Sequence, residues 1–216
     1  RVVRDDLVPG GTKARVAHLL FDDDHDEYVY AGPCQGYAQV ALSYACRVHR
    51  KKCTLFCAKR RVRHIRTLEA IDAGAVVHEV ECGYLSVVKA RAVSYCLESS
   101  AMLLPFGLAA DRIRDGIAHV AGLITPVPTE VWSVAGSGTL STALQAAWPQ
   151  ATFNAVLIGQ RHDSVGIAKM WVAPERYEQV AREPPPFPSC DNYDAKAWRF
   201  VREHAAPGAL FWNVAR

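Results

Sequence analysis

The stretch CTLFCAKRRVRHIRTLEAIDAGAVVHEV (53–80) decides the fold. It begins with a strand-sized apolar run, CTLFCA (53–58), and ends with another, AVVHEV (75–80). Gly74 marks the end of the helical pattern between them, whose apolar residues are Val62, Ile65, Leu68 and Ile71. A strand, a helix and a second strand in this order predict parallel strands joined by a right-handed crossover.

The same alternation continues through the chain. Other strand-sized runs are residues 27–31, 102–105, 130–135, 154–159, 166–172 and 209–215. Helical spacing separates most of them, for example at 37–45 and 139–147. The Pro-rich piece 183–190 predicts a surface connection before a last helix over 194–204. The sequence therefore predicts an α/β fold with open, mostly parallel twisted sheets and flanking helices.

Composition excludes several classes of protein. Of 216 residues, 50% are hydrophobic and 22% are charged, which is too apolar for a disordered chain. No apolar run reaches the roughly 18 residues of a membrane span, and we expect neither a membrane segment nor a signal peptide. The seven cysteines form no C-x-x-C pair, which favours a reducing, cytoplasmic setting with Cys53 and Cys57 as buried thiols instead of metal ligands.

Charge is segregated although the formal net charge is only +3. Residues 47–66 contain nine Lys or Arg and no Asp or Glu, whereas residues 22–27 read DDDHDE. Segregation of this kind marks either solvated faces or a docking surface for phosphates.

Three loops have the composition of ligand sites. Parallel α/β sheets bind ligands beyond the carboxyl ends of their strands, where helices begin. The first loop carries Lys13 after Gly10 and Gly11, at the predicted start of a helix. A lysine near the positive end of a helix dipole does not stabilise the helix, so it is either simply exposed or kept for chemistry.

The other two loops offer backbone N–H groups. In AGPCQGYA (31–38), a Gly/Pro turn precedes a helix and can present these groups to a carboxylate. In VAGSGTLS (134–141), glycines and hydroxyls at a helix start form a phosphate cradle. This loop lacks the G-x-G-x-x-G and Walker spacings, which favours the phosphate of a cofactor smaller than NAD or ATP.

Taken together, the three loops resemble the fold type II pyridoxal-phosphate (PLP) enzymes of the tryptophan synthase beta-like superfamily. The resemblance is strongest to the aminocyclopropane-carboxylate (ACC) deaminase and D-cysteine desulfhydrase branch. There an RDD-type segment leads to Gly-Gly-x-Lys-x-Arg, which here is Arg4–Asp6 followed by Gly10–Arg15. The resemblance implies that Lys13 forms the Schiff base with PLP. Desolvation and a helix N-terminus would both favour the neutral amine that an imine needs.

The resemblance also implies the remaining site residues. The substrate carboxylate is expected at a loop formed by Gly32, Pro33, Cys34, Gln35 and Gly36. Gln35 stands where the family has an asparagine that contacts the cofactor ring. The cofactor phosphate is expected at Gly136, Ser137, Gly138 and Thr139.

Three more side chains complete the expected site. Tyr37 and Tyr193 are candidates for a second acid or base beside Lys13. Tyr193 lies in DNYDAKAW (191–198), which resembles the branch's D-P-x-Y-T-G-K-A stretch without its proline and glycine. Asn213, in the last strand, is placed to bond the pyridine nitrogen, which an asparagine cannot fully protonate.

The implied organisation is two lobes around a cofactor cleft. The larger, cofactor-binding lobe is expected to contain residues 1–30 and 111–216, and the smaller lobe residues 31–110. The 53–80 pattern is that of the family's small domain. We also expect a homodimer.

Three functions are consistent with these motifs. The first is a PLP-dependent enzyme acting on a small α-amino acid, of lyase, deaminase or β-elimination type. The second acts on an amino acid attached to a nucleic acid base, for example by decarboxylation in viral DNA hypermodification, with residues 47–66 binding nucleic acid. The third is a non-catalytic module that binds PLP. Fold analogy does not choose among them.

Overall fold

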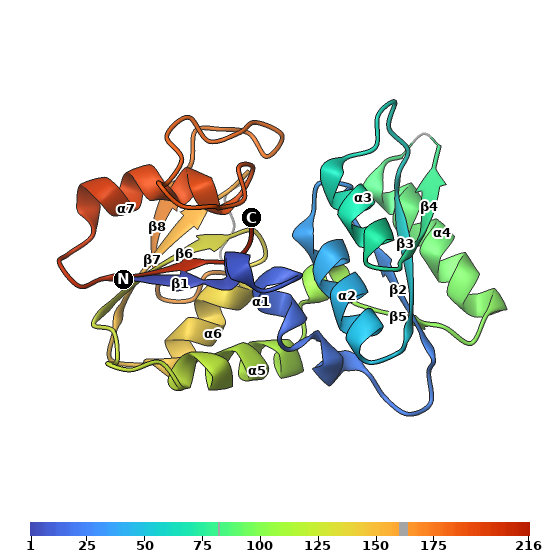
Figure 1. The fold of residues 1–216 in the computed structure, drawn as a ribbon, viewed down its shortest axis with the longest axis horizontal. Coiled ribbons are helices and arrows are strands. Elements are labelled where there is room, and N and C mark those ends of the chain that lie inside the picture. The colour runs from blue at the N-terminus through green and yellow to red at the C-terminus, as the bar shows by residue number, and fades with distance from the viewer. Residues whose placement is uncertain (82, 160–163) are drawn as a thin grey trace. The chain divides into compact units, whose positions relative to one another are not determined.

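The computed structural model describes residues 1–81, 83–159 and 164–216, so Cys82 lies outside the described residues. The chain forms two compact units (Figure 1). The first unit contains Arg1–Thr12 and Asp111–Arg216, and the second contains Lys13–Ala110.

The first unit is built on a five-stranded sheet of order β1-β9-β6-β7-β8, in which every pairing is parallel. Its strands are β1 (Val2–Arg4), β6 (Glu130–Ala135), β7 (Thr152–Leu157), β8 (Lys169–Val172) and β9 (Leu210–Asn213). Its helices are α5 (Asp111–Gly122), α6 (Thr139–Ala147) and α7 (Trp198–His204). The helix α7 lies on one face of the sheet, and α5 and α6 lie on the other (Figure 1).

Alternation along β6 places its two sets of side chains in different layers. Trp132 and Val134 join a buried cluster that includes Phe211 of β9 and packs against Trp198 of α7. Residues 136–138 connect the end of β6 to the start of α6.

The second unit has a four-stranded parallel sheet of order β4-β3-β2-β5. Its strands are β2 (Glu27–Ala31), β3 (Lys52–Ala58), β4 (Val76–Val80) and β5 (Met102–Leu103). Its helices are α2 (Tyr37–Val48), α3 (Ile65–Asp72) and α4 (Leu85–Glu98). The one-turn helix α1 (Gly11–Ala14) links the two units along the chain.

The sheet of the second unit is covered on both faces. Tyr28 and Tyr30 of β2 pack in a buried cluster with Leu42 of α2. Val29 and the other alternate residues of β2 and β3 pack in a second cluster with Val88 of α4. This explains why β2 and β3 are nearly continuous apolar runs in the sequence.

The predicted α/β class with parallel sheets is confirmed. Strands β2 and β6 have the predicted bounds, whereas the last helix begins at Trp198 after a 3-10 turn over Asp194–Ala197. Residues 13–30, expected in the larger lobe, belong to the second unit because β2 pairs with β3 and β5. No helix among the described residues is long and apolar enough to cross a membrane.

Candidate functional site

The carboxyl ends of β1, β9 and β6 lie at one edge of the first unit's sheet, since all three strands are parallel. Thr12 is fixed at this edge by three hydrogen bonds. Its N–H donates to Val214 O at 3.1 Å, and its hydroxyl donates to Asp5 Oδ2 at 2.7 Å. The indole N–H of Trp212 donates to the same hydroxyl at 2.9 Å. Thr12, the residue before Lys13, is therefore fixed at the carboxyl edge of this sheet.

Lys13 itself belongs to the second unit. Its amine donates to the carbonyl oxygen of Gly107, and desolvation lowers its pKa from 10.5 to about 8. Lys13 lies in the one-turn helix α1, and desolvation is the only cause of its pKa shift, so the expected contribution of a helix N-terminus is not among the causes. Burial alone accounts for the shift, and it increases the neutral fraction of the amine.

The loop Gly136–Thr139 connects β6 to α6 in the predicted way. Gly138 has φ of 76°, and a Cβ there would lie 1.9 Å from the carbonyl oxygen of Ser164, so only glycine fits. The hydroxyl oxygens of Ser137 and Thr139 are 3.0 Å apart. The first turn of α6 has N–H groups without intrahelical partners, so the loop offers backbone and hydroxyl donors to an anion.

Tyr193 contacts this loop within the first unit. Its hydroxyl lies beside Gly136, because a Cβ on Gly136 would lie 3.1 Å from the hydroxyl oxygen. Burial raises the pKa of Tyr193 well above its ordinary value. The structure thus brings Tyr193 to the predicted phosphate loop.

Asn213 is buried with its amide engaged by protein groups. Its Nδ2 donates to Asp6 Oδ1 and to Pro188 O, both at 2.8 Å, and its Oδ1 accepts from Ser189 Oγ at 2.7 Å. Both amide protons are therefore already donated, which leaves only the second lone pair of Oδ1 for a ligand.

Asp194, which the sequence analysis did not select, lies in the same unit. Its Oδ2 accepts the N–H of Ala215 at 3.2 Å, and its Oδ1 has no hydrogen-bond partner among the described residues. Burial raises the pKa of Asp194 well above 3.8, with Asp5 and Asp6 adding to the shift. The sequence shows this residue only as an ordinary acidic residue at a helix start, whereas its burial depends on the last strand.

The loop Gly32–Gly36 follows β2 in the second unit. It is closed by Gly36 N donating to Pro33 O at 2.9 Å, and Gln39 Nε2 donates to Cys34 O at 2.6 Å. Cys34 Sγ donates to Gln35 Oε1 at 3.2 Å. These contacts fix the loop at the start of α2.

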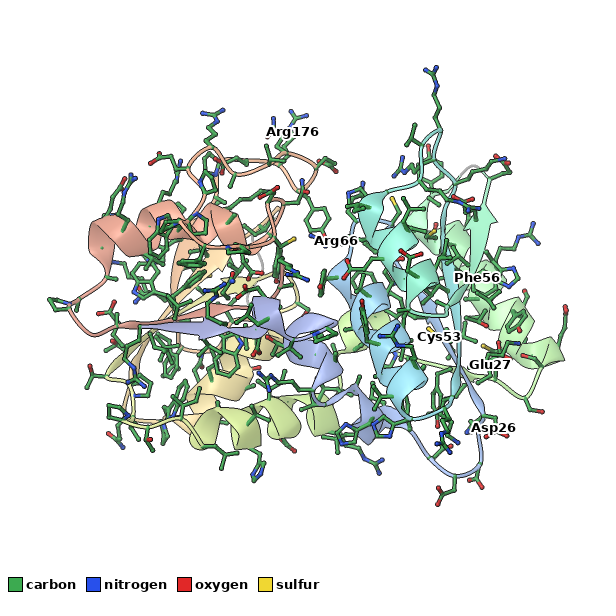
Figure 2. The ribbon with its side chains drawn as sticks, viewed as in Figure 1. Asp26, Glu27, Cys53, Phe56, Arg66 and Arg176 are labelled. Carbon is green, nitrogen blue, oxygen red and sulfur yellow. The ribbon has the colours of Figure 1, made fainter. Side chains whose placement is uncertain are left out.

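Tyr37, the other predicted acid or base, contacts α3. Its hydroxyl donates to Glu69 Oε1 at 3.3 Å, and the guanidinium of Arg66 lies 4.9 Å from its ring centroid. Arg66 also pairs with Glu69. Tyr37 is thus part of a charged cluster at the start of α3, where Figure 2 labels Arg66.

Tyr30 and Gly107 are further residues that the sequence analysis did not select. The Gly107 N–H donates to the Tyr30 hydroxyl at 3.2 Å, while the Gly107 carbonyl accepts from Lys13. A Cβ on Gly32 would overlap the Tyr30 ring, 2.5 Å from Cε1. Lys13, Gly107, Tyr30 and Gly32 therefore form one connected group in the second unit.

The basic segment 47–66 is largely neutralised by carboxylates. The pairs are Lys51–Asp26, Lys52–Glu27, Lys59–Glu81, Arg63–Glu79 and Arg66–Glu69. Figure 2 labels Asp26 and Glu27, which come from the acidic stretch 22–27 and lie at the amino end of β2. Five of the nine cations thus have carboxylate partners, which weakens the case for a phosphate-docking surface.

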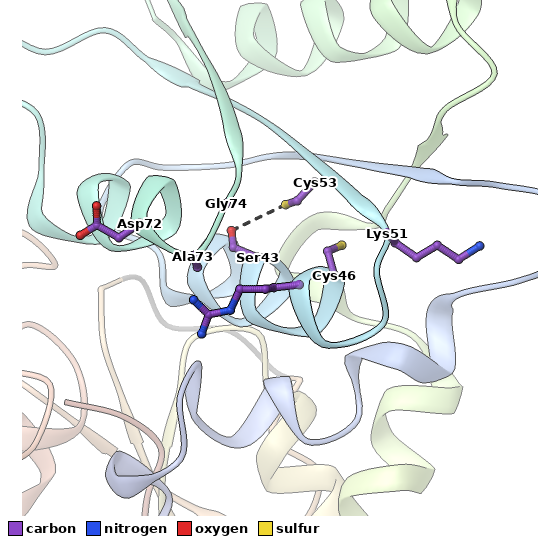
Figure 3. A pocket seen from close by; sticks show the side chains of 8 residues that line it. Ser43, Cys46, Lys51, Cys53, Asp72, Ala73 and Gly74 are labelled. Carbon is purple, nitrogen blue, oxygen red and sulfur yellow. Dashed lines mark hydrogen bonds between the residues drawn. The ribbon is translucent and has the colours of Figure 1, made fainter.

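A cavity of about 190 Å³ lies at the amino end of β3 (Figure 3). Its lining contains Ser43, Cys46, Arg47, Lys51, Cys53, Asp72, Ala73 and Gly74. None of the predicted site residues is among them. Cys53 and Cys57 are buried free thiols. The neighbouring Cys53 thiol and burial raise the pKa of Cys46.

No protein-family model and no curated protein matches this chain. Solved structures do share its fold. An ACC deaminase homologue matches with a TM-score of 0.82 at 14% identity, covering 99% of this chain and 83% of that chain. A threonine deaminase from T.th. gives 0.67 at 15% identity, covering 98% and 84%. Diaminopropionate ammonia lyase from Escherichia coli gives 0.64 at 10% identity, covering 99% and 76%. The predicted fold type II architecture is confirmed.

Proposed function

We propose that this chain is a PLP-dependent enzyme that acts on an α-amino acid. The observation that carries the proposal is the partly buried Lys13 side chain, whose amine donates to Gly107 O and whose pKa desolvation lowers to about 8. An exposed lysine has a pKa of about 10.4, so Lys13 has a much larger neutral fraction at neutral pH. A neutral amine is the form that attacks an aldehyde.

Two features of the first unit fit the cofactor. The loop Gly136–Thr139 offers hydroxyl groups and the free N–H groups at the start of α6, which suits the phosphate. The orphaned Oδ1 of Asp194 suits the pyridine nitrogen, because a proton shared between them gives that buried oxygen a partner. We therefore propose Asp194 for the role that the sequence analysis gave to Asn213, whose amide protons are already donated.

When bound, PLP withdraws electrons from the amino acid Cα. This chain's residues supply the rest of the chemistry. Lys13 Nζ, held at Gly107 O, takes and returns a proton. Asp194 holds a proton at Oδ1, since its pKa is raised. Asn213 positions Asp6 and the segment around Pro188.

A lyase or deaminase reaction is the proposed class. The similar solved structures include an ACC deaminase homologue, threonine deaminase and diaminopropionate ammonia lyase. These names support this reaction class by analogy of fold alone, and the residues of the site must decide it. A module that binds PLP without turnover predicts instead that no amino acid changes the spectrum of the bound cofactor.

Borohydride reduction followed by peptide mapping tests the proposal. Reduction fixes PLP permanently to the lysine that carries it. We expect the added mass on the peptide that contains Lys13. Label spread over exposed lysines such as Lys59, or found on buried Lys196, would contradict the role of Lys13.

A further inference from the structure

Tyr28 and Tyr30 lie on the same face of β2 and are both buried, but their hydroxyl groups differ in their hydrogen bonds. Tyr28 is 0% exposed and Tyr30 is 3% exposed. The Tyr28 hydroxyl accepts the N–H of Asp22 at 2.6 Å and lies 3.1 Å from the carbonyl oxygen of Asp22, to which it donates. Its donor and its acceptor are both satisfied.

The Tyr30 hydroxyl is satisfied on one side only. It accepts the N–H of Gly107 at 3.2 Å, and within the described residues its own proton has no acceptor. Burial raises the pKa of Tyr30 to about 12, so the hydroxyl keeps this proton at neutral pH. Buried polar groups nearly always have a partner, and an unmatched one calls for a physical explanation.

The position of this hydroxyl relates it to two predicted site features. The oxygen lies 2.6 Å from the place that a Cβ on Gly32 would occupy, at the first residue of the loop expected to bind a carboxylate. The peptide of Gly107 joins it on the other side to the Lys13 amine. The hydroxyl proton of Tyr30 thus lies between Gly107, which accepts from Lys13, and the loop that begins at Gly32. These residues all belong to the second unit.

We propose that the Tyr30 hydroxyl donates its free proton to the carboxylate of the bound amino acid, which makes Tyr30 a substrate-binding residue. A carboxylate is the favoured acceptor because a hydrogen bond to a charged group is about twice as strong as a neutral one. The inference rests on the proposed function, and it adds a donor that the loop residues do not provide.

The test compares two amines on the PLP-loaded protein. Glycine has a carboxylate and methylamine lacks one, and each is titrated by the spectral change that it causes. We expect Tyr30→Phe to reduce the affinity for glycine roughly tenfold or more, which is the effect of losing one charge-assisted hydrogen bond. The affinity for methylamine should not change, and the control Tyr28→Phe should reduce the affinity for neither amine. Equal effects on both amines, or no effect on glycine, would overturn the proposal.

A second measurement needs no cofactor. In the free protein Tyr30→Phe loses only the hydrogen bond that the Gly107 N–H donates, so it should lower the melting temperature less than Tyr28→Phe does. Tyr28→Phe removes satisfied hydrogen bonds and should lower it by roughly 2–4 °C. If Tyr30→Phe is as harmful as Tyr28→Phe, the hydroxyl has a protein acceptor and the inference fails. If neither amine changes the spectrum of the wild type, the proposed function fails, and the melting comparison still decides the role of the Tyr30 proton.

Discussion

The amine of Lys13 donates a hydrogen bond to the carbonyl oxygen of Gly107, which lies 94 positions further along the chain. The contact holds the amine in surroundings that lower its pKa to about 8. It also connects the lysine to Tyr30, since the N–H of Gly107 donates to the tyrosine hydroxyl. The backbone of Gly107 thus links the side chains of Lys13 and Tyr30.

The depressed pKa of Lys13 makes stability depend on pH. The unfolded lysine titrates near 10.5 and the folded one near 8, so between these values the unfolded chain binds more protons. The free energy of unfolding of the wild type should therefore rise with pH relative to Lys13→Met. At pH 7 we expect Lys13→Met to be more stable by roughly 1–3 kcal/mol, with the gap narrowing by about pH 10. Urea unfolding at both pH values measures this, and a constant gap would contradict it.

The raised pKa of Asp194 should change the free energy of unfolding with pH in the opposite direction. Its folded pKa is raised above the unfolded value of 3.8, so above that pH the folded state retains a proton that the unfolded chain has lost. The stability of the wild type relative to Asp194→Asn should then fall as the pH rises from about 4 to 7. We expect Asp194→Asn to be the more stable protein at pH 7, by roughly 1 kcal/mol or more. If the stability of the wild type relative to Asp194→Asn rises over this pH range instead, the carboxyl is ionised and paired.

Thr12 anchors the residue before Lys13. Thr12→Val removes the hydroxyl that binds Asp5 and Trp212, and should cost about 1–2 kcal/mol of unfolding free energy. Thr12→Ser keeps the hydroxyl and should recover most of this loss. Equal stability of the valine and serine variants in urea would show that the hydrogen bonds contribute little.

Gly138 has two reasons to be glycine, and Gly74 has one. Both have positive φ, but a Cβ on Gly138 would meet Ser164 whereas a Cβ on Gly74 would meet nothing within 4 Å. Gly74→Ala should cost about 1 kcal/mol from backbone strain, and Gly138→Ala clearly more. Only Gly138→Ala should also reduce the affinity for PLP, which is measured by titrating the cofactor-free protein with PLP. Unchanged PLP affinity would remove this loop from the proposed phosphate site.

The sequence predicts what depends on local pattern. β2 and β6 have their predicted bounds because apolar runs with Gly or Pro boundaries report burial directly. The loop before α6 was predicted for the same reason, since its glycines and hydroxyls lie beside the helix that they begin.

What the sequence does not predict depends on distant partners. Nothing in the sequence around Asn213 shows that its amide is engaged, yet Asp6 lies 207 positions away and takes one of its amide protons. Tyr30 looks like an ordinary buried strand residue, and its unmatched proton is evident only once Gly107, 77 positions away, is in place. Residues 13–30 join the second unit because of strand pairing, which no local pattern specifies.

The central claim is that Lys13 binds PLP covalently. The most direct measurement is the absorption spectrum of the purified protein with added PLP, from the near ultraviolet into the visible range, wild type beside Lys13→Ala. We expect an imine band in the wild type that is absent from Lys13→Ala, while the two proteins have the same far-ultraviolet circular dichroism. The same band in both proteins, or no band in the wild type at saturating PLP, would contradict it.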